Sequence, residues 1–164
     1  MKRHIHKGLY GAFIINPDPR KHGDRAKERH PDHAESRTWQ EFVMVMNAFD
    51  TTFDGENEVY AVNTIAFGYH DKPIQLERGR LQRAHVINVT EFDPLNSIHI
   101  HANFFHLYRT GTSLTPHEFT DTISMAQAER HMIEFTYDHP GQFMFHAHQT
   151  EFTELGWMGF FEVT

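Results

Sequence analysis

Short segments rich in β-branched, aromatic and aliphatic residues recur along the chain, with turn-forming residues between them. Some segments alternate apolar with polar residues and others are uniformly apolar, and both patterns are typical of β-strands. The predicted strands span residues 9–16, 41–49, 59–67, 73–76, 81–89, 98–108, 122–125, 131–137, 142–148 and 158–163. Because helical periodicity is almost absent, this succession predicts an all-β fold, either a β-sandwich or a β-barrel.

Composition narrows the class of protein further. A chain of 164 residues with 39% hydrophobic residues and 15 Phe can bury the core of one globular domain. The formal net charge of −7 leaves no basic field, so nucleic acid is not expected as a partner. The sequence has no apolar run of about 18 residues and no apolar signal core, so no membrane segment is expected. The chain contains no cysteine, which excludes disulfides and thiolate metal ligands.

Two His-x-His pairs stand within predicted strands, Ile98-His99-Ile100-His101 and Phe145-His146-Ala147-His148. Successive side chains of a strand point to opposite faces, so both histidines of a pair project together while their apolar neighbours face the core. Two such pairs brought together present four imidazoles on one surface, and imidazole suits copper, zinc, iron and nickel. The predicted metal ligands are His99, His101, His146 and His148.

The two ends of the chain carry similar sequences. Residues 4–13 align with residues 152–161 at a constant offset of 148 positions. Three pairs of identical residues then coincide: Gly8 with Gly156, Gly11 with Gly159, and Phe13 with Phe161. Because the second copy closes the predicted domain, we expect the first to be the closing strand of a preceding domain.

A polar, charged stretch follows the first copy, with Pro19, Gly23 and Pro31 as breakers, and this composition is typical of a linker. The predicted organisation therefore has three parts. Residues 1–16 are the closing strand of a missing preceding domain, residues 17–38 are a polar linker, and residues 39–164 are the domain itself.

Several further motifs lie between and around the histidine pairs. In chain order they are Val62-Asn63, Pro73-Ile74-Gln75-Leu76-Glu77-Arg78-Gly79, Arg83-Ala84-His85-Val86-Ile87-Asn88, the first His-x-His pair, Asp121-Thr122, Phe135-Thr136-Tyr137-Asp138-His139-Pro140-Gly141, the second pair and Gly156. Their order and spacing resemble the last domain of multicopper oxidases, and the resemblance covers almost the whole chain. That family is built from cupredoxin domains, so the resemblance implies a cupredoxin-like Greek-key β-sandwich or barrel for residues 39–164 and a cupredoxin domain before residue 17.

In this family, four His-x-His pairs from two domains hold a three-copper cluster that reduces dioxygen to water. The resemblance implies that His99 binds the type 2 copper and that His101, His146 and His148 bind the type 3 pair. The other half of the cluster is then expected from a complementary cupredoxin domain or subunit, in a homotrimer. The family's extracytoplasmic location, periplasmic or secreted, is expected for the intact protein.

The chain departs from the family at the electron-accepting type 1 copper. The positions of its ligands hold Asn96, Ala147, Phe152 and Trp157. Some two-domain, laccase-like members carry type 1 copper only in their first domain, and this chain resembles their second, so we expect little activity from it alone. His4 aligns with Phe152, where the preceding domain's type 1 histidine is expected, which implies that Met1 is internal to a longer reading frame.

Alternatives remain open at this point. A copper nitrite reductase-like domain would use fewer histidines around a single type 2 copper. A cupin-like barrel would hold one zinc, iron or manganese on His99, His101 and one histidine of the second pair, but residues 103–106 lack the glutamate it normally adds. A noncatalytic copper-binding domain is a third alternative. We expect a structural role for His106 and a surface position for Glu151 and Glu154.

Overall fold

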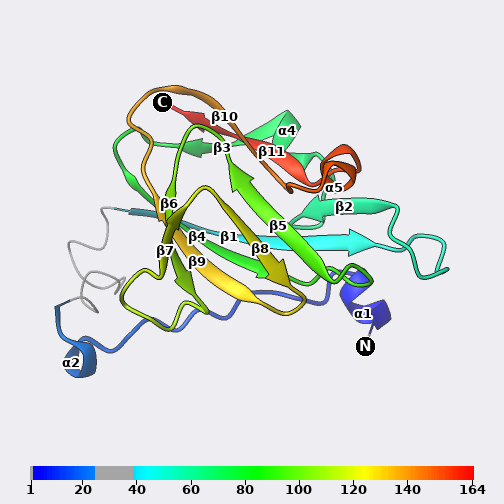
Figure 1. The fold of residues 1–164 in the computed structure, drawn as a ribbon, viewed down its shortest axis with the longest axis horizontal. Helices are drawn as coiled ribbons and strands as arrows, with labels where there is room; N and C mark the ends of the chain where they lie inside the picture. The colour runs from blue at the N-terminus through cyan, green and yellow to red at the C-terminus, as the bar shows by residue number, and fades with distance from the viewer. Residues whose placement is uncertain (1, 25–38) are drawn as a thin grey trace.

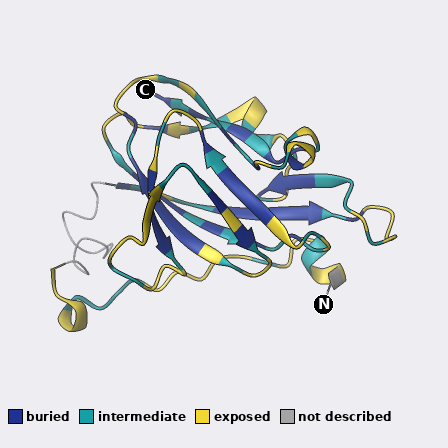
Figure 2. Cartoon of the chain, viewed as in Figure 1, coloured by how far each residue is buried: buried dark blue, intermediate teal, exposed yellow. Residues whose placement is uncertain are grey.

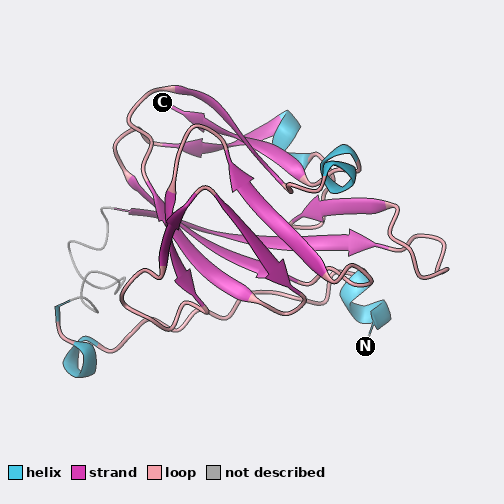
Figure 3. Cartoon of the chain, viewed as in Figure 1, coloured by secondary structure: helices cyan, strands magenta, loops and turns pink. Residues whose placement is uncertain are grey.

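The structure is a computed structural model, and it describes residues 2–24 and 39–164 (Figure 1). Eleven strands are present among these residues, and their bounds are β1 (Trp39–Phe49), β2 (Val59–Val62), β3 (Lys72–Leu76), β4 (Leu81–Asn88), β5 (Leu95–Ile100), β6 (Phe105–Arg109), β7 (Glu118–Thr120), β8 (Thr122–Ala126), β9 (Arg130–Phe135), β10 (Gly141–His146) and β11 (Met158–Val163). The helices are short: α1 (Lys2–His6), α2 (Pro19–His22), α4 (Gly68–Asp71) and α5 (Thr150–Glu154) (Figure 3). The prediction of an all-β fold is confirmed.

The strands form two sheets that pack face to face. One sheet has six strands in the order β2-β1-β4-β9-β6-β7, and the other has five in the order β3-β11-β10-β5-β8. Two pairs are parallel, β1 with β4 and β11 with β3, while the remaining neighbours are antiparallel. The chain therefore crosses between sheets repeatedly, as a β-sandwich with non-consecutive neighbours requires.

The core lies between the sheets, where the strands are dark blue in Figure 2. Alternation along β5 buries Ile98 and Ile100 completely, and alternation along β10 buries Phe145. The largest fully buried side chains include Trp157 and Phe161 at the C-terminal end of the chain. Aromatic side chains of this size supply much of the apolar area that a small sandwich buries.

Three predicted strands differ from the structure by more than one or two residues at an end. Residues 9–16 form no strand, and they run as an unpaired segment along the lower edge of the molecule in Figure 1. The strand predicted over 59–67 ends at Val62, because Asn63 and Thr64 have positive φ angles of 52° and 75°. The strand predicted over 98–108 is interrupted at residues 101–104, where Ala102 has a φ of 57°, and so becomes β5 and β6.

The linker predicted over residues 17–38 lies mostly outside the described residues, which resume at 39. Its described part contains α2, whose first turn is capped because the Asp18 side chain accepts a hydrogen bond from the Arg20 backbone amide at 3.0 Å. Within residues 2–24 and 39–164, the structure shows no helix with the length and apolar composition needed to cross a bilayer.

A buried ion pair lies in the six-stranded sheet. The Arg83 guanidinium on β4 donates to Glu134 Oε1 on β9 from Nε at 2.8 Å and from Nη2 at 2.6 Å. The Tyr108 hydroxyl donates to the other carboxylate oxygen at 2.9 Å, and the Trp39 ring lies 4.2 Å from the guanidinium carbon. These contacts satisfy both charges, which is the condition for tolerating an ion pair at this depth.

Candidate metal centre

The register of two neighbouring strands brings the His-x-His pairs together. β5 and β10 are antiparallel, and His99 lies directly opposite His146. His101 follows the end of β5, and its backbone amide donates to the Met144 carbonyl at 2.9 Å. His148 follows the end of β10, and its backbone amide donates to Ser97 Oγ at 2.8 Å. All four predicted ligands thus project from one region of the five-stranded sheet.

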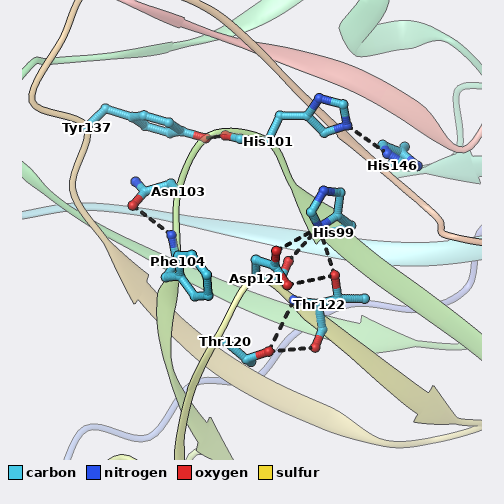
Figure 4. A network of polar contacts seen from close by, with 9 residues as sticks. All are labelled: His99, His101, Asn103, Phe104, Thr120, Asp121, Thr122, Tyr137 and His146. Carbon is cyan, nitrogen blue, oxygen red and sulfur yellow. Dashed lines mark hydrogen bonds and ion pairs between the residues drawn. The ribbon is translucent and has the colours of Figure 1, made fainter.

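We call His99, His101, His146 and His148 the histidine cluster. One ring nitrogen from each of His99, His101 and His146 lies within 4.8 Å of the others. The Nε2 atoms of His101 and His146 are 3.0 Å apart (Figure 4). The His148 ring is farther out, with its centroid 5.7 Å from that of His99 and 5.9 Å from that of His146. Three imidazoles therefore converge closely and the fourth borders them.

The orientation of His99 is fixed from the neighbouring strand. Its Nδ1 lies 2.9 Å from the Asp121 carbonyl oxygen and 2.8 Å from Thr122 Oγ1, as Figure 4 shows. A carbonyl only accepts, so Nδ1 carries the proton and Nε2 keeps a free lone pair. A partner on the second nitrogen of a ligating imidazole is the usual way in which proteins orient metal-binding histidines.

The His146 ring is also oriented through its Nδ1, by the residue that follows β10. Its Nδ1 lies 2.5 Å from the Ala147 carbonyl oxygen, which also accepts a hydrogen bond from Thr153 Oγ1 at 2.6 Å. Thr153 lies on α5, so this short helix contributes to the position of the ring. The Nε2 lone pair of His146 is again the one left for another ligand or donor.

The turn that carries His101 is fixed by Tyr137. The Tyr137 hydroxyl donates to the His101 carbonyl oxygen at 2.8 Å, and its ring stacks on Phe143 of β10 with centroids 4.3 Å apart. Burial raises the pKa of Tyr137 above its ordinary value, so the phenol remains a donor. The sequence motif around residue 137 gave no sign of this contact, because it joins residues 36 positions apart.

Two rings of the histidine cluster, those of His101 and His146, favour the neutral form. Burial lowers the pKa of His101 below its usual value, and the neighbouring His99 and His148 add to the effect. Burial also lowers the pKa of His146, and His101 and His99 act in the same direction, whereas the hydrogen bond that its Nδ1 donates to the Ala147 carbonyl raises that pKa. Neutral imidazole is the form that donates a lone pair to a metal, so the cluster suits divalent metal binding.

The four positions of the type 1 ligands hold no metal-binding arrangement. Ala147, Phe152 and Trp157 are buried members of the hydrophobic core. The Phe152 ring stacks on Tyr60 with centroids 4.0 Å apart. Asn96 is also buried, and its side-chain amide donates to Thr90 Oγ1 at 2.8 Å. The positions expected for type 1 ligands are therefore occupied by three core side chains and one buried, hydrogen-bonded amide.

The remaining histidines and carboxylates of interest lie elsewhere. His106 is exposed, and its ring lies 4.8 Å from that of Phe119. Glu151 and Glu154 are exposed, as expected of surface carboxylates. His85 contacts Glu41 at 2.8 Å on the outer side of β4.

An open hollow of about 470 Å³ borders the histidine cluster. It is lined by His99, Ile100, His101, Ala102, Asn103, Phe104, Phe119 and Asp121. Phe104 and Phe119 form its apolar rim, where their rings stack at 5.4 Å although each side chain is more than half exposed. Two stacked and exposed phenylalanines thus lie beside the converging imidazoles.

Comparisons with known proteins agree with this geometry. The sequence model of the multicopper oxidase family matches residues 27–164. A crystal structure of a multicopper oxidase is 56% identical over 76% of this chain and 44% of its own, with a TM-score of 0.75. None of the curated proteins compared with the chain matches it.

More distant solved structures share the fold. A copper-containing nitrite reductase from Thermus scotoductus is 18% identical over 92% of this chain and 34% of its own, with a TM-score of 0.70. A laccase from Pediococcus acidilactici is 20% identical over 94% of this chain and 32% of its own, with a TM-score of 0.66. The chain thus spans less than half the length of these structures.

Proposed function

The chain belongs to the multicopper oxidase family, and on that premise we propose that its histidine cluster holds copper as one half of a trinuclear site that reduces dioxygen to water. The convergence of ring nitrogens from His99, His101 and His146 within 4.8 Å is the observation that carries the proposal. Imidazole nitrogen binds copper strongly, and bound copper would supply the electron transfer to dioxygen. Copper is therefore the cofactor for which the donor set is best suited.

The finer assignment of copper types follows the family pattern. We propose that His99 is a ligand of the type 2 copper and that His101, His146 and His148 are ligands of the type 3 pair. The short distance between His101 Nε2 and His146 Nε2 supports placing these two on neighbouring sites. In the metal-free chain the Nε2–H of His101 donates a hydrogen bond to His146 Nε2, and His101 would carry its proton on Nδ1 instead when its Nε2 binds copper.

A complementary cupredoxin domain or subunit completes the site in this proposal, within a homotrimer. Four imidazoles supply half of the eight that the trinuclear cluster requires. The open hollow and the exposed Phe104 and Phe119 lie beside the histidine cluster, where a covering subunit would bury apolar area. The chain by itself is then expected to consume little dioxygen.

A single-metal site is the second candidate function. It is favoured by the fact that His148 stands outside the group formed by the other three ring nitrogens. A type 2 copper on His99, His101 and His146 would suffice for a nitrite reductase-like domain. In that case His148→Ala would leave copper affinity and stoichiometry unchanged. The trinuclear proposal instead predicts that His148→Ala weakens copper binding at one of the sites.

Copper titration of the full chain by equilibrium dialysis tests the proposal. We expect His101→Ala and His146→Ala each to weaken copper binding by about 10-fold or more, because each removes an inner-sphere ligand. His106→Ala is the matched control, since it removes an exposed imidazole that packs on Phe119. Wild-type binding in both ligand variants would overturn the assignment.

We propose an extracytoplasmic location for the intact protein, on the ground of its family alone. Cell fractionation with an antibody against the chain tests this directly. Recovery in the cytoplasmic fraction would contradict the location and leave the copper proposal unaffected.

A further inference from the structure

The backbone of His148 is held by a single side chain of the neighbouring strand. The pairing of β10 with β5 ends where His146 lies opposite His99. Two residues further along the same register, His148 falls opposite Ser97. Its amide donates to the Ser97 side chain, with 2.8 Å between the nitrogen and Oγ. Among the described residues, this is the one hydrogen bond that the structure gives to His148.

Ser97 is placed for this contact by the alternation of β5. It stands two residues before His99, so both side chains project from the same face of the strand. The Ser97 residue is only 3% exposed, and its backbone amide donates to Asn96 Oδ1 at 2.7 Å. Because a buried hydroxyl needs hydrogen-bond partners, this position favours a residue with defined polar contacts.

The direction of every hydrogen bond in this group follows from the Leu95 carbonyl. A carbonyl only accepts, so the Gln149 atom that lies 3.2 Å from it is the donor Nε2. Gln149 Oε1 then faces Ser97 and accepts from its hydroxyl. The single hydroxyl proton of Ser97 is used in this bond, and the Ser97 oxygen is left to accept from the His148 amide. The network therefore has only one consistent polarity.

Gln149 connects the same network to α5. It is the N-cap residue of that helix, yet its side chain makes no capping hydrogen bond and reaches back to β5 instead. Its backbone carbonyl accepts from the Thr153 amide at 3.2 Å, and Thr153 Oγ1 donates to the Ala147 carbonyl at 2.6 Å. Residues 147–149 are thus tied to β5 on one side and to α5 on the other.

The His148 ring depends on its backbone for its place in the histidine cluster. It is exposed, and it lies outside the group of three converging ring nitrogens. The rings of His99 and His146 are each oriented by a carbonyl on Nδ1, whereas within the described part of the chain the structure gives the His148 ring no hydrogen bond. The distance of this ring from the other three is therefore set by the segment that carries it.

We propose that Ser97, supported by Gln149, is a positioning residue that fixes His148 beside the other three histidines. Without the Ser97 hydroxyl, the His148 amide and Gln149 Oε1 both lose their partner, and the end of β10 is no longer tied to β5 at this point. The consequence for copper rests on the proposed function, because His148 matters there only as the fourth ligand of the histidine cluster.

Hydrogen exchange of the His148 amide in the metal-free chain, followed by nuclear magnetic resonance, tests the structural part. We expect Ser97→Ala to speed this exchange by about 10-fold, the effect of losing one hydrogen bond. Gln149→Leu should act in the same direction, and Ser97→Thr, which keeps a hydroxyl, should stay near the wild-type rate. Ser124→Ala is the matched control, since Ser124 lies opposite Ser97 on β8 and is exposed. Wild-type exchange in both Ser97→Ala and Gln149→Leu would overturn the proposal.

Copper titration by equilibrium dialysis tests the consequence for the histidine cluster. Ser97→Ala should weaken copper binding by about 10-fold at the site that His148→Ala also weakens, and Ser97→Thr should restore it. When His148 is already replaced by alanine, Ser97→Ala should weaken copper binding no further. An equal loss with and without His148 would reveal a general structural effect and overturn the positioning role.

The two measurements separate this inference from the proposed function. If the wild-type chain binds no copper at the histidine cluster, the proposed function fails. Faster exchange of the His148 amide in Ser97→Ala would then still support the placement of His148 by Ser97.

Discussion

His101 Nε2 and His146 Nε2 lie 3.0 Å apart although the residues are 45 positions apart in the sequence. Two strand ends produce this contact, since His146 pairs with His99 on β5 and His101 begins the turn that follows β5. Burial lowers the pKa of both rings, so two neutral imidazoles face one another across a hydrogen bond. Such a pair suits metal binding because both rings are already neutral and only the proton on His101 Nε2 has to move to Nδ1.

The hydroxyl of Thr122 should matter for copper affinity through His99. Thr122→Val removes an oxygen 2.8 Å from His99 Nδ1 and leaves Asp121 to orient the ring, with its carbonyl oxygen at 2.9 Å and its carboxylate at 4.0 Å. We expect about a 10-fold loss of copper affinity with little change in the melting temperature. Isothermal titration with copper measures this, and Thr112→Val on the exposed loop after β6 is the control. An unchanged affinity in Thr122→Val would show that Asp121 alone suffices.

The buried pair of Arg83 and Glu134 should be sensitive to the loss of either partner. Glu134→Leu leaves a guanidinium that is 4% exposed without its carboxylate, and we expect a loss of about 3–5 kcal/mol in the free energy of unfolding. Denaturant unfolding measures the difference. The double variant with Arg83→Met should recover part of the loss, because it removes the unpaired charge.

The exposed pair of Arg109 and Glu118 provides the matched control for that prediction. Their side chains are 42% and 45% exposed, and Glu118→Leu should cost less than about 1 kcal/mol. If Glu134→Leu and Glu118→Leu lower the free energy of unfolding by the same amount, burial does not decide the cost of removing a carboxylate from these ion pairs.

His131 should make the metal-free chain less stable in mild acid. It is buried, its Nδ1 accepts a hydrogen bond from the Thr110 amide at 3.1 Å, and burial lowers its pKa below 6.5. The unfolded chain then binds more protons than the folded chain below pH 6.5. The contribution of neutral His131 to the free energy of unfolding is therefore fully present above pH 6.5. It is lost as the pH falls from there through the pKa of His131 in the folded chain.

The pH dependence can be measured as the free energy of unfolding at several pH values between about 7.5 and 5. His131→Asn retains an acceptor for the Thr110 amide but does not titrate, so its stability should fall less steeply with acid. His106→Asn, at an exposed ring, should keep the wild-type slope. Equal slopes in His131→Asn and the wild type would refute the prediction.

The sequence was sufficient to predict which side chains face the core in the two histidine strands. Side chains alternate with a period of two, so the burial of Ile98, Ile100 and Phe145 follows from the pattern alone. The positions of strand ends were less predictable. The interruption between β5 and β6 depends on Ala102 in a left-handed conformation, which its residue type does not signal.

Two other differences have tertiary causes. β2 ends because the Asn63 side chain takes over pairing with β1, accepting from the Val45 amide at 2.8 Å and donating to the Val43 carbonyl at 2.9 Å. Residues 9–16 have the composition of a strand, but they pair with none of the described strands, and strand pairing is a tertiary contact that composition does not fix. The contact between Thr122 and His99 could likewise not be predicted from the sequence, because it exists only when β5 and β8 pair.

Paramagnetic resonance of the chain loaded with one equivalent of Cu(II) reports on the ligands of copper at the histidine cluster. We expect nitrogen couplings from more than one imidazole, because His99, His101 and His146 converge on one region. His99→Ala, His101→Ala and His146→Ala should each change those couplings, and His106→Ala should leave them as in the wild type. An identical spectrum in the wild type and all three ligand variants would contradict a copper site at the histidine cluster.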